Sequence, residues 1–264
     1  TPKPSSAASD VYKRQGDRRE ELIKTVNRVQ PHAADGSTRF VMPDASGGGK
    51  AAIKMIVSKP HTVTTVALWT GLFMNLLTVY FLNSWLPIMV KDDGFTLADA
   101  AMVGAMMQLG GTFGNIVIGW LMDRWAQHYV QIGALTFAGA LTVALGNLDP
   151  DINGLMALCF FLGFCINSSN TGWTAMAAGY YPTSMRATGT SWMTGIGRFG
   201  AISGASIGAV LLGLQWDFGQ LFLALTVPIG IAVVAAFVKG SQRRSRVQTL
   251  DEADAAVPVL RPRA

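Results

Sequence analysis

The chain consists of long apolar runs separated by short polar connections. Between residues 62 and 238 charged residues nearly vanish, and apolar stretches of membrane-spanning length follow one another. A helix needs about 20 mostly apolar residues to cross the hydrocarbon core of a bilayer. The sequence therefore predicts an all-α membrane protein with six transmembrane helices, at residues 62–90, 98–122, 129–147, 152–179, 188–214 and 219–238.

The segments on either side of these spans have a different composition. Residues 1–15 lack the apolar region of a signal peptide and resemble a translated cloning or sequencing scar, so we expect them to be non-native and disordered. Residues 16–61 contain a modest amphipathic pattern and then a turn-rich stretch, which predicts a cytoplasmic linker. Residues 239–264 are basic, then acidic, and are predicted to form a disordered cytoplasmic tail.

The basic residues indicate how the spans are oriented. Eleven Lys and Arg residues precede the first span and six follow the last. Arg124 and Arg186 lie in the second–third and fourth–fifth connections. The first–second, third–fourth and fifth–sixth connections, on the other side of the membrane, contain Lys91 alone. The positive-inside rule places both termini in the cytoplasm of a multi-pass inner-membrane protein. The net charge of +5 is then explained by topology, and no nucleic-acid partner is expected.

Several polar side chains recur on one side of a span. In the second span Gly104, Gln108, Gly111 and Asn115 follow one another at i, i+4, i+7 and i+11. Such a stripe must face protein or water, and two roles remain open: helix packing by hydrogen bonds, or lining of a central cavity. Other candidate lining residues are Asn75, Tyr80 and Asn83 in the first span, and Asn167, Asn170 and Trp173 in the fourth. For Trp173, packing between helices is the more common role.

The fifth span contains an arginine, Arg198, about ten residues from its start. Placing an arginine at a helix centre costs about 2.5–3.5 kcal/mol, and the spans carry no acidic residue away from their ends. A contact with a lipid headgroup or a backbone carbonyl is one explanation. A guanidinium also grips a carboxylate with two parallel hydrogen bonds, so we expect Arg198 to bind an anionic substrate. Gly200, Gly204 and Gly208 form a ladder of small residues beside it, which predicts a close helix contact.

An enzymatic function is not expected. Residues 204–208 read GASIG and match the Gly-x-Ser-x-Gly pattern of hydrolases, but that pattern requires a strand-to-helix turn and a histidine partner. His32, His61 and His128 all lie outside the predicted spans or at their ends, on the cytoplasmic side. No cofactor or metal is expected either.

Two motifs carry a resemblance to a known superfamily. The second span ends with Gly119-x-x-x-Asp123-Arg124, followed by His128, and resembles the loop signature of the major facilitator superfamily, with Ala126 in place of the usual glycine. Residues 180–200, YYPTSMRATGTSWMTGIGRFG, resemble the loop and eleventh helix of its aromatic acid:H⁺ symporter family.

The resemblance implies that the chain is the C-terminal six-helix half of a twelve-helix transporter, beginning in the central cytoplasmic loop. It implies proton-coupled import of benzoate, hydroxybenzoate or phenylpropionate derivatives by alternating access. The implied partners are an organic anion, a proton, the lipid bilayer and a missing N-terminal half, so the chain alone is not expected to transport. The implied cytoplasmic gate comprises Gly119, Asp123, Arg124, His128 and Arg186.

Two other functions remain open. Transporters of sugars and other metabolites share this layout and the Pro182-x-x-x-Arg186 turn. A six-helix channel or assembly protein could oligomerise through the glycine ladder of the fifth span.

Overall fold

The computed structural model describes residue 56, residues 61–148 and residues 151–256, excluding the side chains of residues 183–184 and 243–256. The predictions for residues 1–55, 57–60 and 257–264 therefore lie outside the described part. All described residues belong to one compact unit, Ser46–Ala264.

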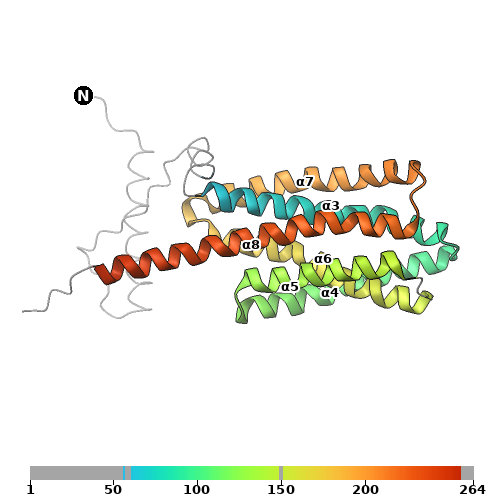
Figure 1. Ribbon diagram of the computed structural model, residues 1–264, viewed down its shortest axis with the longest axis horizontal. Coiled ribbons are helices and arrows are strands. Elements are labelled where there is room, and N and C mark those ends of the chain that lie inside the picture. The colour runs from blue at the N-terminus through green and yellow to red at the C-terminus, as the bar shows by residue number, and fades with distance from the viewer. Residues whose placement is uncertain (1–55, 57–60, 149–150, 257–264) are drawn as a thin grey trace, which may run out of the picture. The chain divides into compact units, whose positions relative to one another are not determined.

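Six helices make up the described part, and each is long and apolar enough to cross a membrane. They are α3 (Thr62–Asp92), α4 (Leu97–Arg124), α5 (Gln127–Asn147), α6 (Ile152–Tyr180), α7 (Thr183–Gly213) and α8 (Phe218–Ala256) (Figure 1). The described residues contain no strand. The predicted all-α fold with six membrane-spanning helices is confirmed.

Local sequence signals explain where these helices begin. The Thr96 hydroxyl accepts a hydrogen bond from the Asp99 amide at 3.2 Å, and the Asp99 carboxylate accepts one from the Thr96 amide at 3.1 Å. This capping box satisfies amides that have no partner within α4. Asp151 caps α6 in the same way by accepting from the Gly154 amide at 3.2 Å. Gly94, with a φ of +98°, allows the tight connection between α3 and α4.

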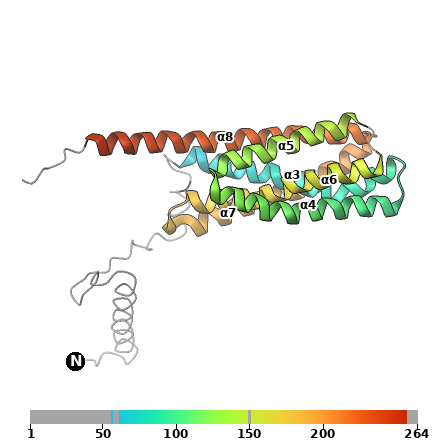
Figure 2. The same cartoon turned by 90° about the horizontal axis from the view of Figure 1, so that it is seen from below.

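The helices alternate in direction and pack mainly in three pairs: α3 with α7, α4 with α6, and α5 with α8. Helix α3 also packs against α4, α6 and α8, whereas α7 and α8 barely contact each other (Figures 1 and 2). One end of the bundle therefore collects the starts of α3, α5 and α7 and the ends of α4 and α6.

Glycines allow two of these pairs to approach backbone to backbone. A Cβ atom on Gly200 or Gly204 of α7 would lie 2.2 or 2.1 Å from the carbonyl oxygen of Phe73 or Leu77 of α3. In the other pair, a Cβ on Gly110 of α4 would lie 1.9 Å from a carbonyl oxygen of α6. The ladder predicted in the fifth span is thus the contact surface between α7 and α3.

Two helices extend beyond the predicted spans. Helix α7 begins at Thr183, five residues before the predicted start at residue 188. Helix α8 continues to Ala256, whereas the sequence predicts that the last span ends at residue 238 and that a disordered tail follows. Residues 241–256 contain no Gly or Pro and are rich in helix-forming residues, so this segment suits a helix. The division of the chain into linker, membrane domain and tail stays a prediction.

Candidate functional site

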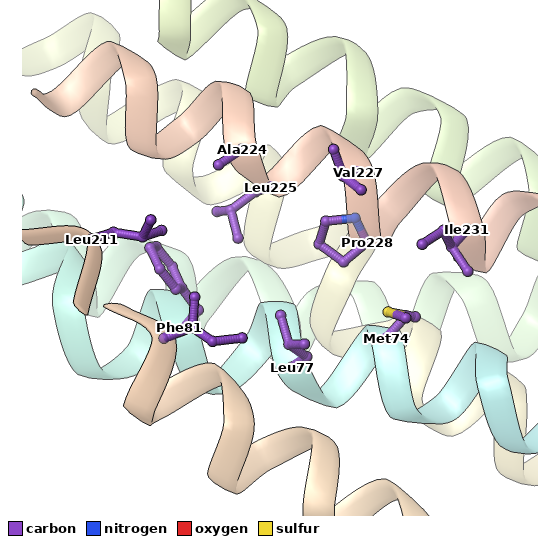
Figure 3. Close-up of a pocket in the computed structure, with 10 residues that line it drawn as sticks. Met74, Leu77, Phe81, Leu211, Ala224, Leu225, Val227, Pro228 and Ile231 are labelled. Carbon is purple, nitrogen blue, oxygen red and sulfur yellow. The ribbon is translucent and has the colours of Figure 1, made fainter. Parts of the chain in front are cut away.

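Arg198 lies in the middle of α7 and is exposed. Among the described residues, none forms a hydrogen bond or ion pair with its guanidinium. Ile207 follows nine residues later, two and a half turns along the helix, and so projects from the opposite side of α7. Ile207 is one of the residues that line an apolar cavity. Residues of α3 and α8 border the same cavity (Figure 3). Arg198 therefore projects away from the side of α7 that borders this cavity.

Polar side chains join α4 to α6 in two places. The Asn167 amide donates to the Gln108 side-chain oxygen at 3.2 Å, and the Thr171 hydroxyl donates to the Asn115 side-chain oxygen at 2.7 Å. We call Gln108–Asn167 and Asn115–Thr171 the α4–α6 polar pairs. Gln108, Asn115 and Thr171 are exposed and Asn167 is half-buried, so the pairs hold the helices together and still present polar atoms at the surface. The hydrogen bonds show the packing role, and the lining of a central cavity stays a prediction.

Contacts between helices give the relative depth of these groups. Leu72 contacts Gly197, the residue before Arg198, and the neighbouring Gly71 packs against the Trp173 ring of α6. Arg198 and Trp173 therefore lie at about the same depth in the bundle.

The two polar pairs lie at different depths. Thr171 is two residues from Trp173, which is about 3 Å along the helix axis, whereas Asn167 is six residues away, about 9 Å. The Asn115–Thr171 pair is therefore nearly level with Arg198. The Gln108–Asn167 pair lies farther toward the connection between α7 and α8.

Tyr80 and Asn83 are exposed on α3. They share one side of this helix with Leu76, because residues at i, i+4 and i+7 lie on one face. Leu76 contacts Gly197 beside Arg198, so Tyr80 and Asn83 lie on the same flank of the α3–α7 pair as the arginine. They are about 6 and 11 Å beyond Leu76 along the helix, nearer to the α3–α4 connection.

Two predicted substrate-binding residues are instead buried inside the six-helix unit. Trp173 is 0% exposed with its ring against Gly71, and Asn75 is 2% exposed. The helical phase explains the burial of Asn75, which lies one turn after Gly71 and so shares its inward-facing side of α3. Neither polar atom of the Asn75 side chain has a hydrogen-bond partner among the described residues. Asn170, by contrast, is exposed beside the α4–α6 polar pairs.

Two polar residues of the bundle escaped the sequence analysis as site candidates. Thr171 completes one of the polar pairs. Gln131 of α5 is fully buried, and its amide donates to the Ser169 carbonyl at 3.2 Å. The sequence could have indicated Gln131, because it is a polar residue within the predicted span 129–147.

The predicted gate residues all lie at the end of the bundle where α4 ends and α5 and α7 begin. They are dispersed there. Asp123 is exposed, and the Arg124 guanidinium lies 4.3 Å from the centroid of the Trp120 ring. Gly119 is half-buried, with open space where a side chain would project.

The other two gate candidates contact neighbouring helices. His128 is buried and packs against Gly240 of α8, and its ring lies tilted against that of Tyr129 with ring centroids 4.1 Å apart. The Arg186 Nε donates to the Tyr181 carbonyl at 3.3 Å.

Tyr181 fixes the connection between α6 and α7. Its hydroxyl donates to the Thr65 hydroxyl of α3 at 3.3 Å, and the ring is buried. Burial raises the pKa of the Tyr181 phenol, so it stays protonated and can keep donating this bond.

Six helices that are each long and apolar enough to cross a membrane define a multi-pass membrane protein. The chain matches the Major Facilitator Superfamily over residues 34–262 and belongs to that superfamily.

Within the superfamily the chain is similar to transporters of aromatic acids. It is 38% identical to the 4-hydroxybenzoate transporter PcaK of Pseudomonas putida, over 90% of this chain and 53% of that protein. It is 39% identical to a gallate transporter of Pseudomonas putida, over 78% of this chain and 46% of the relative. It is 33% identical to the 3-(3-hydroxy-phenyl)propionate transporter of Escherichia coli (strain K12), over 74% of this chain and 48% of the relative. The resemblance predicted from the motifs is confirmed, and the chain spans about half the length of these relatives.

Proposed function

We propose that the chain is the C-terminal six-helix half of a transporter that imports aromatic carboxylates together with protons by alternating access. Membership of the superfamily supports a transport function. The relatives named above are transporters of hydroxylated aromatic acids, which supports the substrate class. The chain spans about half the length of these relatives, which supports a second half that completes the substrate cavity.

The exposed guanidinium of Arg198 is the observation that carries this proposal. It lies in mid-span on the side of α7 opposite the apolar cavity, where a carboxylate arriving in a central cavity could reach it. A carboxylate would form two charge-assisted hydrogen bonds with it, which offsets the cost of an arginine at this depth.

The α4–α6 polar pairs are the proposed binding site for a ring hydroxyl. Gln108 and Asn115 each keep a side-chain amide donor, and Asn167 and Thr171 keep an acceptor, after forming their mutual bonds. A hydroxyl group both donates and accepts, whereas an ionised carboxylate only accepts. The carboxylate of a hydroxylated aromatic acid thus matches Arg198, and its ring hydroxyl matches the α4–α6 polar pairs. Tyr80, Asn83 and Asn170 would lie along the edge of this binding site.

The remaining elements of the proposal concern coupling and gating. The spans carry no acidic residue away from their ends, so we assign the proton-carrying group to the other half. The gate residues at the His128 end would open and close access from the cytoplasm, where the basic residues place both termini of the chain. The chain alone would then bind the anion without transporting it.

Substitution of Arg198 tests the proposal in the complete transporter, meaning this chain joined to its N-terminal half. Arg198→Ala should lower kcat/KM for 4-hydroxybenzoate uptake by about ten- to a hundredfold, the effect of losing a charged hydrogen-bond partner. Arg198→Lys keeps the charge and should retain part of the activity. Phe199→Ala, at the neighbouring exposed position, is the control and should transport normally. Normal uptake by Arg198→Ala, or equal competition by a sugar, would show that the proposal is wrong.

Removing one polar pair tests the hydroxyl site separately. Gln108→Leu combined with Asn167→Leu should raise KM for 4-hydroxybenzoate by about tenfold or more and leave benzoate uptake nearly unchanged, because a site built for a hydroxyl discriminates through its hydrogen bonds. KM values for the two substrates, measured in parallel, give the answer. An equal loss for both would assign the pair to helix packing.

A further inference from the structure

We propose that the apolar cavity between α3, α7 and α8 binds one acyl chain of a membrane phospholipid. The cavity has a volume of about 260 Å³. Figure 3 shows Met74, Leu77 and Phe81 of α3 on one side, facing Leu225 and Pro228 of α8. Its complete lining is Met74, Leu77, Phe81, Ile207, Leu211, Ala224, Leu225, Val227, Pro228 and Ile231, all of which are apolar.

The cavity opens toward the surroundings of the bundle. Residues on its rim are substantially exposed: Ile207 by 41%, Val227 by 63% and Ile231 by 38%. Arg198 projects from the opposite side of α7, as the helical phase shows. Polar atoms of a membrane helix must face protein or water, whereas the apolar and exposed rim of the cavity is suited to contact with lipid. The cavity is thus continuous with the lipid-facing surface of the protein.

The size and lining of the cavity favour an acyl chain over other occupants. Pockets for drug-sized ligands have volumes of about 300–1,000 Å³ and contain a few polar groups that orient the ligand. This cavity is smaller, and no side chain that lines it has a polar group. A saturated hydrocarbon segment needs no hydrogen-bond partner, and the bilayer supplies it at high local concentration.

The cavity also lies where a lipid chain reaches. Ala224 and Ile231 are about 9 and 20 Å along α8 from its start at Phe218, so the cavity extends from the half of the span nearer to the α7–α8 connection to just past its middle. The lipid is therefore expected to come from the leaflet on that side, which is the outer leaflet if the termini are cytoplasmic.

An occupant would fill a gap that the protein itself leaves. Helices α7 and α8 both pack on α3 but barely contact each other. Walls that face empty space lose the dispersion contacts they would make with packed atoms. A bound acyl chain restores these contacts.

Photolabelling tests this inference in the complete transporter, reconstituted in phosphatidylcholine nanodiscs with a trace of phosphatidylcholine that carries a diazirine in its acyl chain. After illumination, mass spectrometry locates the labelled residues. Label is expected on the cavity floor, at Met74 and Leu77 of α3, in addition to the open apolar surface of α4 at Phe113 and Ile116.

A matched pair of variants shows whether the label comes from within the cavity. Ala224→Phe fills the cavity and should abolish the label on α3 while leaving that on α4. Ala140→Phe adds the same ring to an exposed position of α5 and should change neither. Label confined to α4 in the unmodified protein would overturn the inference without any variant, as would label on α3 that persists in Ala224→Phe.

Discussion

Asn75 and Arg198 show two outcomes for a polar side chain in a membrane span. Arg198 is exposed on a flank shared with other polar groups, whereas Asn75 is buried and both of its polar atoms lack a partner in the described part of the chain. Burial of an amide without hydrogen bonds is unfavourable. Both residues are equally conspicuous in the sequence. What separates them is the rotation of each helix about its axis, which depends on all of its neighbours.

Replacing Asn75 with leucine tests whether this amide is unpaired. Leucine has nearly the same shape, so Asn75→Leu should raise the free energy of unfolding by about 1–3 kcal/mol, the penalty of a buried unsatisfied group. Thermal unfolding in detergent measures this change. Lower stability, or lost substrate binding, would mean that the amide has a partner in the working protein.

Among the elements, the pairing of α3 with α7 depends on glycines that have a packing role. Gly204 lies against the Leu77 carbonyl, so any larger residue must push the helices apart. Gly195 lies on the same helix and has open space where a side chain would project. The two glycines look alike in the sequence, and only the contacts distinguish them.

This difference gives a prediction with an internal control. Gly204→Ala should destabilise the protein by about 1–3 kcal/mol through overpacking. Gly195→Ala should be neutral or stabilising by up to about 1 kcal/mol, because alanine favours the helix. Parallel thermal unfolding of the two variants decides the matter, and equal effects would contradict the contact.

At this scale the sequence predicted a great deal. Spans at 62–90, 98–122 and 152–179 match α3, α4 and α6 within a few residues, because apolar length is a local property of the chain. The helical continuation to Ala256 was missed, because basic and acidic residues suit a helix as well as a disordered segment. The α4–α6 polar pairs depend on which helices meet, so the sequence could name Gln108 and Asn167 but could not pair them.

For the six-helix unit as a whole, labelling of cysteines tests the orientation in the membrane. Cys159 and Cys165 are 0% and 3% exposed, so they should remain silent toward a membrane-impermeant maleimide. Cysteine introduced at exposed Asp151 should react in intact cells, whereas cysteine introduced at exposed Pro182 should react only after permeabilisation. The reverse pattern would place the termini outside.

The arrangement of α3 also determines where this unit can deform. Helix α3 packs on α4, α6, α7 and α8, and its contact with α7 joins backbone to backbone, so these two should translate together. Because α7 and α8 make few contacts with each other, the distance between them should vary more easily than the other distances between helices in the unit. Spin labels on α7 and α8 would then report a broad distribution of distances, whereas labels on α4 and α6 would report a narrow one.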